Sequence, residues 1–370
     1  MNPDAKRFGR GTKFISVMDI LNNQFICYDN IRASVEVVDG DIETYGVNYG
    51  DILFQRSSET LEDVGQANVY LDSKPAVFGG FVIRGKSKSN YYPMFFRYLL
   101  ASPTARKKII VKGAGAQHFN IGQDGLSKVC LNIPSIQEQE KIAKLFECID
   151  TRIATQNKII EDLKKLKSAI SKYLFARKDL LETTICLSNI ATLKNGYAFQ
   201  SGKYNALGKW KILTITNVPG ERYINDEDCN CIINLPNDIQ DHQVLKEGDI
   251  LISLTGNVGR VSLCKNGNYL LNQRVGLLQL AKNVNQEFLY QILSSQRFEN
   301  SMIACGQGAA QMNIGKGDVE NYVLPYSSNG NNILFAAKIL HSYDECIINE
   351  LRRLTLLTMQ KQYLLTQMFI

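Results

Sequence analysis

Two ten-residue stretches decide the organisation of this chain: GAGAQHFNIG at residues 113–122 and GQGAAQMNIG at residues 306–315. They align without a gap at a separation of 193 residues. FFRYLLAS at 95–102 and FLYQILSS at 288–295 align at the same separation. Such self-similarity indicates a repeated structural unit, and it sets the fold interpretation before any local pattern does.

Further matches extend the repeat in both directions. GDILF begins at Gly50 and GDILI at Gly248, while Asp150 matches Asp344 at a separation of 194 residues. All of the matches occur in the same order in both halves. The sequence therefore predicts an internal duplication.

Each half combines a segment of short strands and turns with a long helix. The first long helix is expected after Pro134, where Ser135 as N-cap and Glu138 three residues later form a capping-box pattern. Its apolar residues recur mostly every three or four positions, at Ile142, Leu145, Ile149, Ile153, Ile160, Leu163, Leu166, Ile170 and Leu174. That spacing keeps one face apolar over roughly 40 residues, or ~60 Å.

The second half ends in a similar helix. Its apolar stripe comprises Ile339, Tyr343, Ile347, Leu351, Leu354, Leu357, Leu364 and Met368. Each apolar stripe must pack against another element to be shielded from water. The other long helix has the matching length, so we expect the two to form an antiparallel pair. The alternative is that each helix packs on its own domain.

These patterns predict an α+β protein with two duplicated globular domains joined and separated by two long antiparallel helices, a coiled-coil spacer. The expected boundaries place the globular domains at 1–134 and 183–330. The helical segments occupy 135–182 and 331–370.

Composition narrows the class of protein. Of the 370 residues, 45% are hydrophobic and 21% charged, which excludes general disorder. No apolar run is long enough for a membrane helix, and the first residues lack the apolar core of a secretory signal. The net charge of +6 is compatible with a polyanionic partner and equally with a slightly basic enzyme.

The nine cysteines form no CxxC pair, and the chain has only three histidines. A zinc site is therefore not expected, and the thiols are typical of a reducing cytoplasm.

The ordered motifs resemble those of a known family, the specificity (S) subunits of type I restriction–modification systems. The resemblance rests on GDILF and GDILI, on GAGAQHFNI and GQGAAQMNI, and on IPSIQEQEKIAKLFECID at 133–150 with its long helix. It also rests on LSNIATLKNGYAFQSGKY at 187–204, which leads into WKILTITNV. Each motif alone is weak, whereas the ordered set, present twice, is specific and covers nearly the whole chain.

The resemblance implies two target-recognition domains, each reading one half of a bipartite site in double-stranded DNA. It implies that the two helical segments form the spacer and dock two modification (methyltransferase) subunits and, through them, the restriction subunits. The implied specificity subunit has no catalytic centre and needs no cofactor.

The chain departs from the family pattern near its beginning. KFISVMDI at 13–20 aligns with KILTITNV at 211–218, yet the 24 residues at 187–210 are matched by only twelve residues that do not resemble them. We therefore expect the first recognition domain to lack its opening segment. Whether another chain supplies this segment stays open.

A second departure concerns the start of the second long helix. SIQEQEKI at 135–142 has only SSNGNNIL at 327–334 as its counterpart. We therefore expect the second helix to lack a capping signal.

Motifs for catalysis are not found. The nearest string to a methyltransferase [DNS]PP[YFW] loop is LPYS at 324–327, and no GxxxxGK[ST] phosphate loop occurs. Three scattered histidines give no Ser/His/Asp arrangement. We expect no catalytic residues, no metal site and no cofactor.

Candidate DNA-contacting residues lie in glycine-rich or strand-terminal loops. Arg suits guanine, Asn and Gln suit adenine, and Lys suits phosphate. The candidates are Gln55, Arg56, Ser57, Ser58, Lys107, Lys108, Lys112, Gln117, His118, Thr255, Asn257, Arg260, Gln273, Arg274 and Gln311. The plainer interpretation of each is a turn cap or a solvated surface charge.

Comparison of the two halves refines this set. Asn120 and Asn313 are identical, and domains that read different half-sites should differ at base contacts, so these two are expected to be structural. Two other pairs of equivalent positions differ, as expected for residues that contact bases: His118 matches Gln311, and Arg56 matches Leu254 or Thr255.

The expected partner-binding helix residues are Ile142, Leu145, Ile149, Ile153, Ile160, Leu163, Ile347, Leu351 and Leu354. The competing hypothesis from another functional class is a truncated or decayed scaffold, which binds partner proteins through these helices without reading DNA.

Overall fold

The computed structural model describes residues 1–115, 117–306 and 312–369, and the candidate Gln311 lies outside these ranges. The chain divides into two compact units, Met1–Asn157 with Arg352–Ile370 and Lys158–Leu351. Both division points fall inside the two long helices, α6 (Ile136–Ala176) and α10 (Gly330–Met368). Each unit therefore contains one globular part and one half of each helix.

The described residues of the first unit, unit 1, form three small sheets and five short α-helices before α6. Its strands are β1 (Phe8–Ile15), β2 (Ala33–Val35), β3 (Gly46–Val47), β4 (Ile52–Gln55), β5 (Ser57–Ser58), β6 (Ala67–Val69), β7 (Ala76–Phe78), β8 (Val82–Gly85) and β9 (Phe119–Asn120). Its short helices are α1 (Val17–Asn22), α2 (Asp41–Tyr45), α3 (Pro93–Ala101), α4 (Pro103–Ile110) and α5 (Gln123–Ser127).

The second unit, unit 2, repeats this arrangement with additional strands. Its strands are β10 (Thr183–Cys186), β11 (Ala191–Asn195), β12 (Trp210–Leu213), β13 (Asn230–Ile232), β14 (Val244–Leu245), β15 (Ile250–Ser253), β16 (Val261–Leu263), β17 (Tyr269–Leu271), β18 (Val275–Leu280) and β19 (Val323–Tyr326). Helices α7 (Gln286–Leu293), α8 (Gln296–Gly306) and α9 (Lys316–Glu320) precede α10.

Sheet order shows the duplication directly. The sheet β2-β1-β7-β3 of unit 1 corresponds to β13-β12-β17-β14 of unit 2, and in both sheets the central pair is parallel. The sheet β6-β4-β8 corresponds to β16-β15-β18, to which unit 2 adds β11 at the edge. The predicted α+β fold with two repeated domains is therefore confirmed.

The repeated GDIL motif forms the same turn in both units. Gly50 and Gly248 both have φ +88°, a left-handed conformation that favours glycine. The following carboxylates, Asp51 and Asp249, accept backbone N–H bonds from three residues earlier at 2.9 and 2.8 Å. The motif thus ends a turn and starts a buried strand, which explains its sequence signal.

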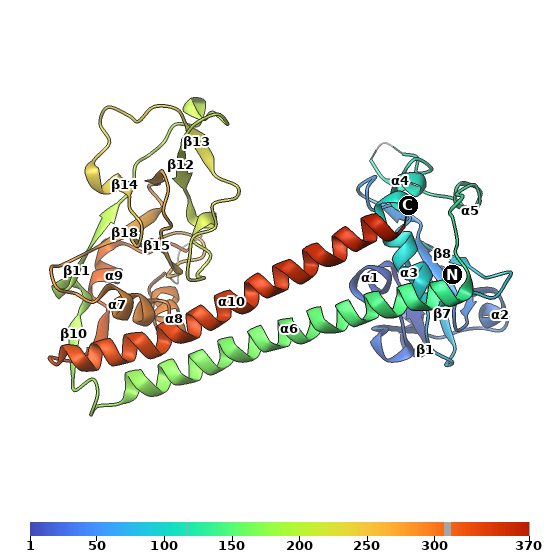
Figure 1. Ribbon diagram of the computed structural model, residues 1–370, viewed down its shortest axis with the longest axis horizontal. Helices are drawn as coiled ribbons and strands as arrows, with labels where there is room; N and C mark the ends of the chain where they lie inside the picture. Colours follow the sequence, from blue (N-terminus) through green and yellow to red (C-terminus); the bar gives the residue numbers. More distant parts are fainter. Residues whose placement is uncertain (116, 307–311, 370) are drawn as a thin grey trace. The chain divides into compact units, whose positions relative to one another are not determined.

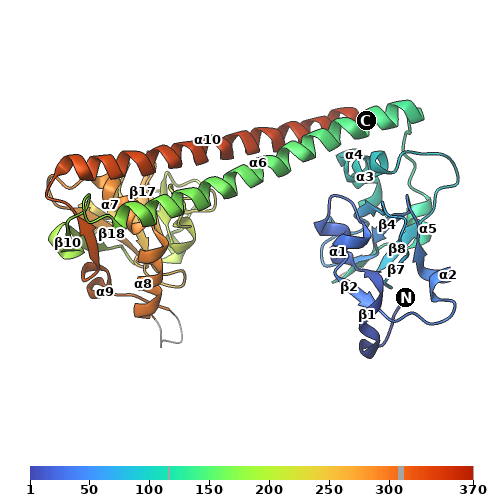
Figure 2. The same ribbon diagram turned by 90° about the horizontal axis from the view of Figure 1, so that it is seen from below.

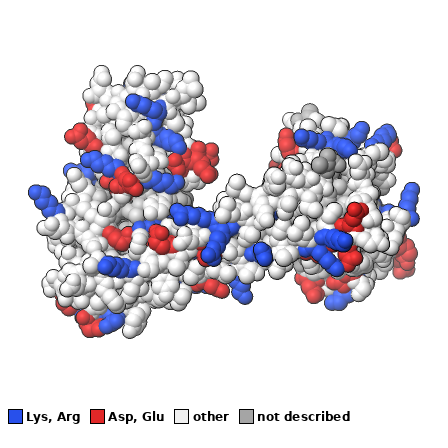
Figure 3. All heavy atoms as spheres, viewed as in Figure 1, with Lys and Arg blue, Asp and Glu red and all other residues white. Residues whose placement is uncertain are grey.

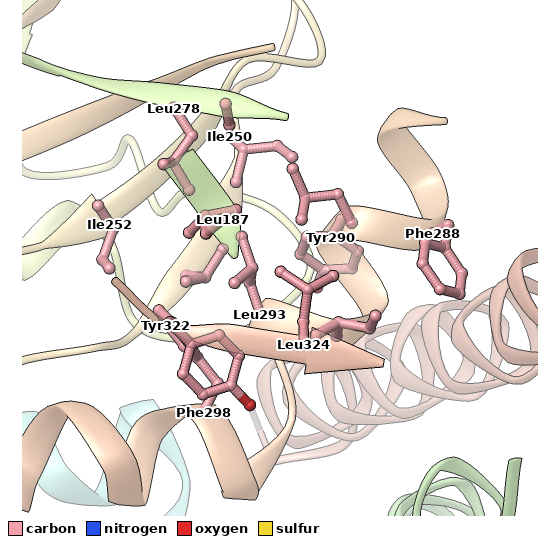
Figure 4. Close-up of a cluster of buried hydrophobic side chains, with 14 of the residues drawn as sticks. Leu187, Ile250, Ile252, Leu278, Phe288, Tyr290, Leu293, Phe298, Tyr322 and Leu324 are labelled. Atoms are coloured by element: carbon pink, nitrogen blue, oxygen red, sulfur yellow. The ribbon is translucent and has the colours of Figure 1, made fainter. Parts of the chain in front are cut away.

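The core of unit 2 lies between the β11-β18-β15-β16 sheet, helices α7 to α9 and the long helices. Figure 4 shows its side chains, in which Ile250 and Ile252 from β15 meet Leu187, Leu278 and Leu324. Phe298 and Tyr322 pack edge to face at a ring-centroid distance of 4.8 Å.

Within each unit the halves of α6 and α10 lie side by side and run antiparallel (Figures 1 and 2). In unit 1, Phe146 of α6 stacks on Phe369 at 5.7 Å between ring centroids and also on Tyr98 of α3 at 4.9 Å. In unit 2, Leu174 and Leu340 belong to one core cluster with the globular part. The helices therefore pair with each other and also pack on the globular parts. The expected helix pair and its alternative, packing on the globular domain, are both present.

An aspartate on a long helix joins three elements in each unit, buried in unit 2 and half-buried in unit 1. Asp344 on α10 accepts hydrogen bonds from Lys167 of α6 at 2.6 Å, Arg222 at 2.9 Å and Gln291 of α7 at 2.6 Å. Its repeat partner Asp150 pairs with Lys361 of α10 at 2.5 Å and accepts from the Tyr98 hydroxyl at 2.8 Å.

The caps of the two long helices differ in kind. Ser135 and Glu138 form the predicted capping box, with the Ser135 hydroxyl 2.8 Å from Glu138. The expectation that the second helix lacks a cap is wrong, because the Asn329 side chain accepts the Asn331 N–H at 3.0 Å. A single asparagine can satisfy a free N–H group at the start of a helix, and a search for the capping-box pattern does not find it.

Glu182 adds a second anchor at this end of α10. It accepts from the backbone N–H and the hydroxyl of Ser328 at 2.7 and 2.9 Å. Hydrogen bonding by the Ser327 hydroxyl, followed by the backbone and Ser328 bonds, lowers the pKa of Glu182 to about 2.

We expect Asp344→Ala to lower the free energy of unfolding by about 3–5 kcal/mol, because it leaves the Arg222 side chain, 8% exposed, and half-buried Lys167 without a shared carboxylate. Urea denaturation measures the loss. Asp162→Ala, which removes an exposed carboxylate of α6, is the matched control and should change stability by less than about 0.5 kcal/mol. Equal effects would show that the Asp344 network is not buried in solution.

Glu182→Gln should change how stability depends on acid pH. The folded-state pKa is depressed, so the carboxylate stabilises the fold above its ordinary pKa of 4.5 and loses this contribution as pH falls towards 2. The stability difference between wild type and variant should therefore shrink between pH 4.5 and 2. Denaturant titrations at several pH values measure it, and a constant difference would contradict the assignment.

Candidate nucleic-acid interface

The candidate reading loops of both units are held by the same hydrogen bond. The Ser57 hydroxyl of β5 bonds Asn120 of β9, and the Thr255 hydroxyl bonds the side-chain oxygen of Asn313 at 3.3 Å. Backbone bridges join the same residue pairs. We call this paired contact the Ser/Thr–Asn clamp, and it agrees with the structural role expected of the two asparagines.

Arg56 follows β4 directly and is one of the exposed candidates of unit 1. Its side chain is exposed, and no ion pair to it occurs among the described residues. It lines a recess with Arg84 and Gln123. The equivalent position in unit 2, Leu254, is 7% exposed and belongs to the core, so the two units differ sharply here.

The neighbours of Arg56 are more constrained. Gln55 is 5% exposed and donates to the Ser57 carbonyl at 2.8 Å, while Ser57 is engaged in the clamp. The Ser58 hydroxyl accepts the Thr60 N–H at 3.3 Å. These three side chains are thus held within the loop.

The loop between Ala114 and Asn120 exposes Gln117 and His118, with the backbone of its ends paired at 2.8 and 2.9 Å. The clamp therefore fixes the base of a loop whose tip carries two predicted reading residues.

The predicted basic cluster lies at the end of α4 and just beyond it. Lys107, Lys108 and Lys112 are all exposed, and Lys108 donates to the Cys130 carbonyl at 3.0 Å. Lysines at the end of a helix also interact favourably with its dipole, so their placement has a structural reason as well.

In unit 2 the candidates divide into free and engaged side chains. Asn257, Gln273 and Arg274 are exposed. Arg260 is paired with Glu299 at 3.4 Å, and Thr255 is 9% exposed within the clamp. Arg274 is thus the more available arginine of this unit.

A carboxylate in unit 2 neutralises two further cations. Asp226 accepts from Lys211 at 2.9 Å, Lys265 at 2.8 Å and the Tyr269 hydroxyl at 3.0 Å. The Lys265 hydrogen bond, with those of Lys211 and Tyr269, holds the pKa of Asp226 far below its usual range despite partial burial. These lysines are therefore occupied within the fold.

On the face shown in Figure 3, Lys and Arg side chains are interspersed with Asp and Glu over both units. That view shows no continuous positively charged surface that would mark a DNA-binding face. The candidate interface is therefore defined by individual side chains.

Two groups of surface residues were missed from sequence. One is a hollow of about 420 Å³ in unit 2 with polar lining side chains from Gln200, Lys203, Asn205, Asn234 and Asn237. The stretch GYAFQSGKY contains part of it, but no spacing rule brings residues 200–205 next to 234–237, because tertiary folding joins them.

The other missed group is apolar. Leu356, Met359 and Tyr363 on α10 are 65%, 62% and 63% exposed, and we call them the outer α10 face. Among the predicted helix residues, Ile149, Ile160 and Ile347 are buried, Ile142, Ile153, Leu163, Leu351 and Leu354 are half-buried, and Leu145 is 41% exposed.

In the ranges that the structure describes, no cluster of His, Cys, Asp and Glu side chains has the makings of a metal site. The same ranges contain no helix with the length and apolarity to span a membrane.

A family model described as the type I restriction modification DNA specificity domain matches residues 1–165 and 182–359. The chain belongs to this family. The specificity-subunit resemblance drawn from the repeated motifs is therefore confirmed.

Two relatives come from Methanocaldococcus jannaschii. The type I restriction enzyme MjaVIII specificity subunit is 26% identical over 281 residues, which cover 69% of this chain and 63% of that relative. The putative type I restriction enzyme MjaX specificity subunit is 26% identical over 309 residues, or 77% and 69% of the two chains. The match thus spans less than two thirds of the first relative's length.

Solved structures support the fold. The type I S subunit from M. genitalium has a TM-score of 0.54 at 16% identity and covers 98% of this chain and 93% of its own. A chain from a structure on complex assembly and conformational transition of the type I R-M system gives 0.58 at 13% identity, covering 90% and 85%.

We expect a measurable coupling across the clamp in unit 2. A double-mutant cycle of Thr255→Val and Asn313→Ala should give about 0.5–1.5 kcal/mol, since each single change removes one partner of the same hydrogen bond. Thr255→Val combined with Leu207→Ala, at a side chain 90% exposed, should be additive. Additivity in both cycles would mean that the clamp is not formed in solution.

Proposed function

We propose that this specificity-family chain recognises a bipartite sequence in double-stranded DNA as part of a type I restriction–modification complex. The observation that carries the proposal is the Ser/Thr–Asn clamp, which holds loops of different chemistry in the two units. A shared support with different exposed residues suits two domains that read different bases.

Unit 1 would read with Arg56, Gln117 and His118, and unit 2 with Asn257, Gln273 and Arg274. These side chains are exposed on or beside the clamped loops and suit guanine or adenine edges. Lys107 and Lys112 would position the DNA through phosphates. Gln55, Ser57, Ser58, Thr255 and Arg260 would support the loops or act after rearrangement.

The long helices would dock two modification subunits and, through them, the restriction subunits. The buried isoleucines hold the fold, so a partner would bind exposed apolar side chains of these helices, among them the outer α10 face and Leu145. Large exposed apolar residues on one helix suit a protein interface.

Methylation and ATP-dependent cleavage would belong to those partners, with no cofactor bound by this chain. A cytoplasmic location, expected from the thiol content, completes the proposal. The competing scaffold hypothesis keeps the docking role and omits DNA reading.

Arg56→Ala should lose discrimination at one position of one half-site, by about 1–3 kcal/mol, or roughly 5–150-fold. Selection from randomised duplex pools, with modification subunits present, measures the preference. Lys107→Ala is the matched control and should weaken all sequences alike with a smaller salt slope. A uniform loss for Arg56→Ala would make it a phosphate contact, and no selected sequence at all would favour the scaffold hypothesis.

Leu356→Asp should abolish co-purification with modification subunits and leave the thermal midpoint nearly unchanged, because this side chain is 65% exposed. Ile149→Asp, at a buried position of α6, should instead unfold unit 1 by placing a charge in an apolar seam. Retained assembly of a folded Leu356→Asp variant would remove this face from the interface.

A further inference from the structure

A short turn beside Arg56 carries an aromatic side chain that lies outside the candidates named so far. Gly79, Gly80 and Phe81 connect β7 to β8, and the Val82 N–H donates to the Gly79 carbonyl at 3.0 Å, which closes the turn. We call these three residues the β7–β8 turn. Because the two glycines have no side chains, only the Phe81 ring projects from it, and this residue is 66% exposed.

Unit 2 has the same turn with different side chains. Asn272, Gln273 and Arg274 connect β17 to β18, and the Val275 N–H donates to the Asn272 carbonyl at 2.9 Å. Both turns begin directly after a strand of the central parallel pair. Phe81 therefore occupies the place of Arg274, one of the residues proposed to read DNA in unit 2.

Backbone hydrogen bonds hold the two turns in equivalent positions. The Arg56 N–H donates to the Phe81 carbonyl at 2.8 Å, and the Leu254 N–H donates to the Arg274 carbonyl at 3.1 Å. The carbonyls of Arg56 and Leu254 each accept at 2.9 Å from the isoleucine of the repeated NIG sequence, one residue after the clamp asparagine. The same framework thus places Phe81 and Arg274 beside the Ser/Thr–Asn clamp.

Phe81 and Arg56 lie opposite each other on the same face. The β4–β8 ladder pairs Gln55 with Val82, and these two residues are 5% and 4% exposed. Side chains alternate between the two faces along a strand, so the next opposed pair, Arg56 and Phe81, points to the other face, where both are exposed. Opposed residues of antiparallel strands have Cβ atoms about 4.5–5.5 Å apart. A guanidinium and an aromatic ring are therefore neighbours on the surface of unit 1.

The corresponding pair in unit 2 has its arginine on the other strand. It consists of Leu254, which is 7% exposed and belongs to the core, and exposed Arg274. Each unit thus has one arginine and one large apolar residue at this pair, but only unit 1 exposes both. Single exposed apolar residues are common on protein surfaces, so the inference below depends on the position of Phe81 and not on its exposure alone.

This position is exposed even where the neighbouring sheet edge is covered. In unit 2, β11 pairs with β18, and the Gln273 N–H donates at 3.0 Å to the carbonyl of Tyr197, two residues after β11. Arg274 is nevertheless exposed. The turn itself therefore directs this residue away from the fold in both units.

We infer that Phe81 is a specificity-determining residue, which contacts the 5-methyl group of a thymine in the half-site read by unit 1. This inference rests on the proposed function. The thymine methyl is an apolar group on the major-groove edge of a base pair, and Phe is one of the side chains that contact it.

The geometry also places the thymine relative to the base read by Arg56. The Cβ atoms of opposed residues lie about 5 Å apart, and successive base pairs of B-DNA are separated by about 3.4 Å. The thymine therefore lies within about two base pairs of the position that Arg56 reads.

The test uses the full chain assembled with modification subunits. Selection from randomised duplexes first gives the target sequence, and each thymine is then replaced in turn by deoxyuridine, which lacks only the methyl group. We expect one replacement, within about two base pairs of the position relaxed by Arg56→Ala, to weaken binding about fourfold, the effect of one buried methyl group. Phe81→Ala should bind both duplexes alike at that position and keep the preference that depends on Arg56.

Two further variants separate a base contact from a general effect on the fold. Phe81→Leu keeps an apolar side chain and should still distinguish thymine from deoxyuridine. Tyr49→Ala removes an aromatic side chain that is 64% exposed at the opposite end of β4, and it should leave selection unchanged. Thermal unfolding checks that each variant is folded.

Three results overturn the inference: no replacement of thymine that Phe81→Ala makes neutral, an equal loss of affinity for all sequences in Phe81→Ala, or loss of modification subunits from Phe81→Ala with normal DNA selection. The last result would identify a protein contact. Normal Arg56-dependent selection in these cases leaves the proposed function intact. If the wild-type assembly selects no sequence at all, the proposed function and this inference fail together.

Discussion

The aspartate that each long helix directs at its neighbours, Asp344 on α10 and Asp150 on α6, forms the interaction on which both units depend. Asp344 draws Lys167 of the opposing helix and two side chains of the globular part, Arg222 and Gln291, to one carboxylate. Asp150 does the same with Lys361 and Tyr98. Because a buried carboxylate without partners is costly, the contact sets which residues of α6 and α10 face each other and where the globular part sits on them.

The two units share the same supporting hydrogen bonds and turns but differ in the side chains of the loops that these contacts hold. The clamp pairs and the GDIL turns recur because they close backbone hydrogen bonds that any sequence at the tip would need. Arg56 against buried Leu254 shows the opposite behaviour at a neighbouring position. Family membership and this division of labour together favour DNA reading by the loops over a purely scaffolding role.

The duplication also serves as an internal control. Unit 2 buries Ile250 and Ile252 in a core that includes residues 180–195, and unit 1 leaves Ile52 and Phe54 half-buried in a sheet whose edge strand, β8, pairs with β4 alone among the described residues. The exchange of Gly276 for Ile83 and of Leu278 for Gly85 gives the first face a distinct shape. Differences within one chain are thus as informative as its similarities.

The sequence by itself determined the duplication, the α+β class, the two long helices and the capping box at Ser135. These follow from periodicity, from repeats and from side chains that bond within a few residues. The tertiary structure alone decided that Arg260 pairs with Glu299 and that Gln55 is buried. It also decided which helix residues remain exposed, since apolar spacing is the same for a face that packs inside the fold and for one that stays at the surface.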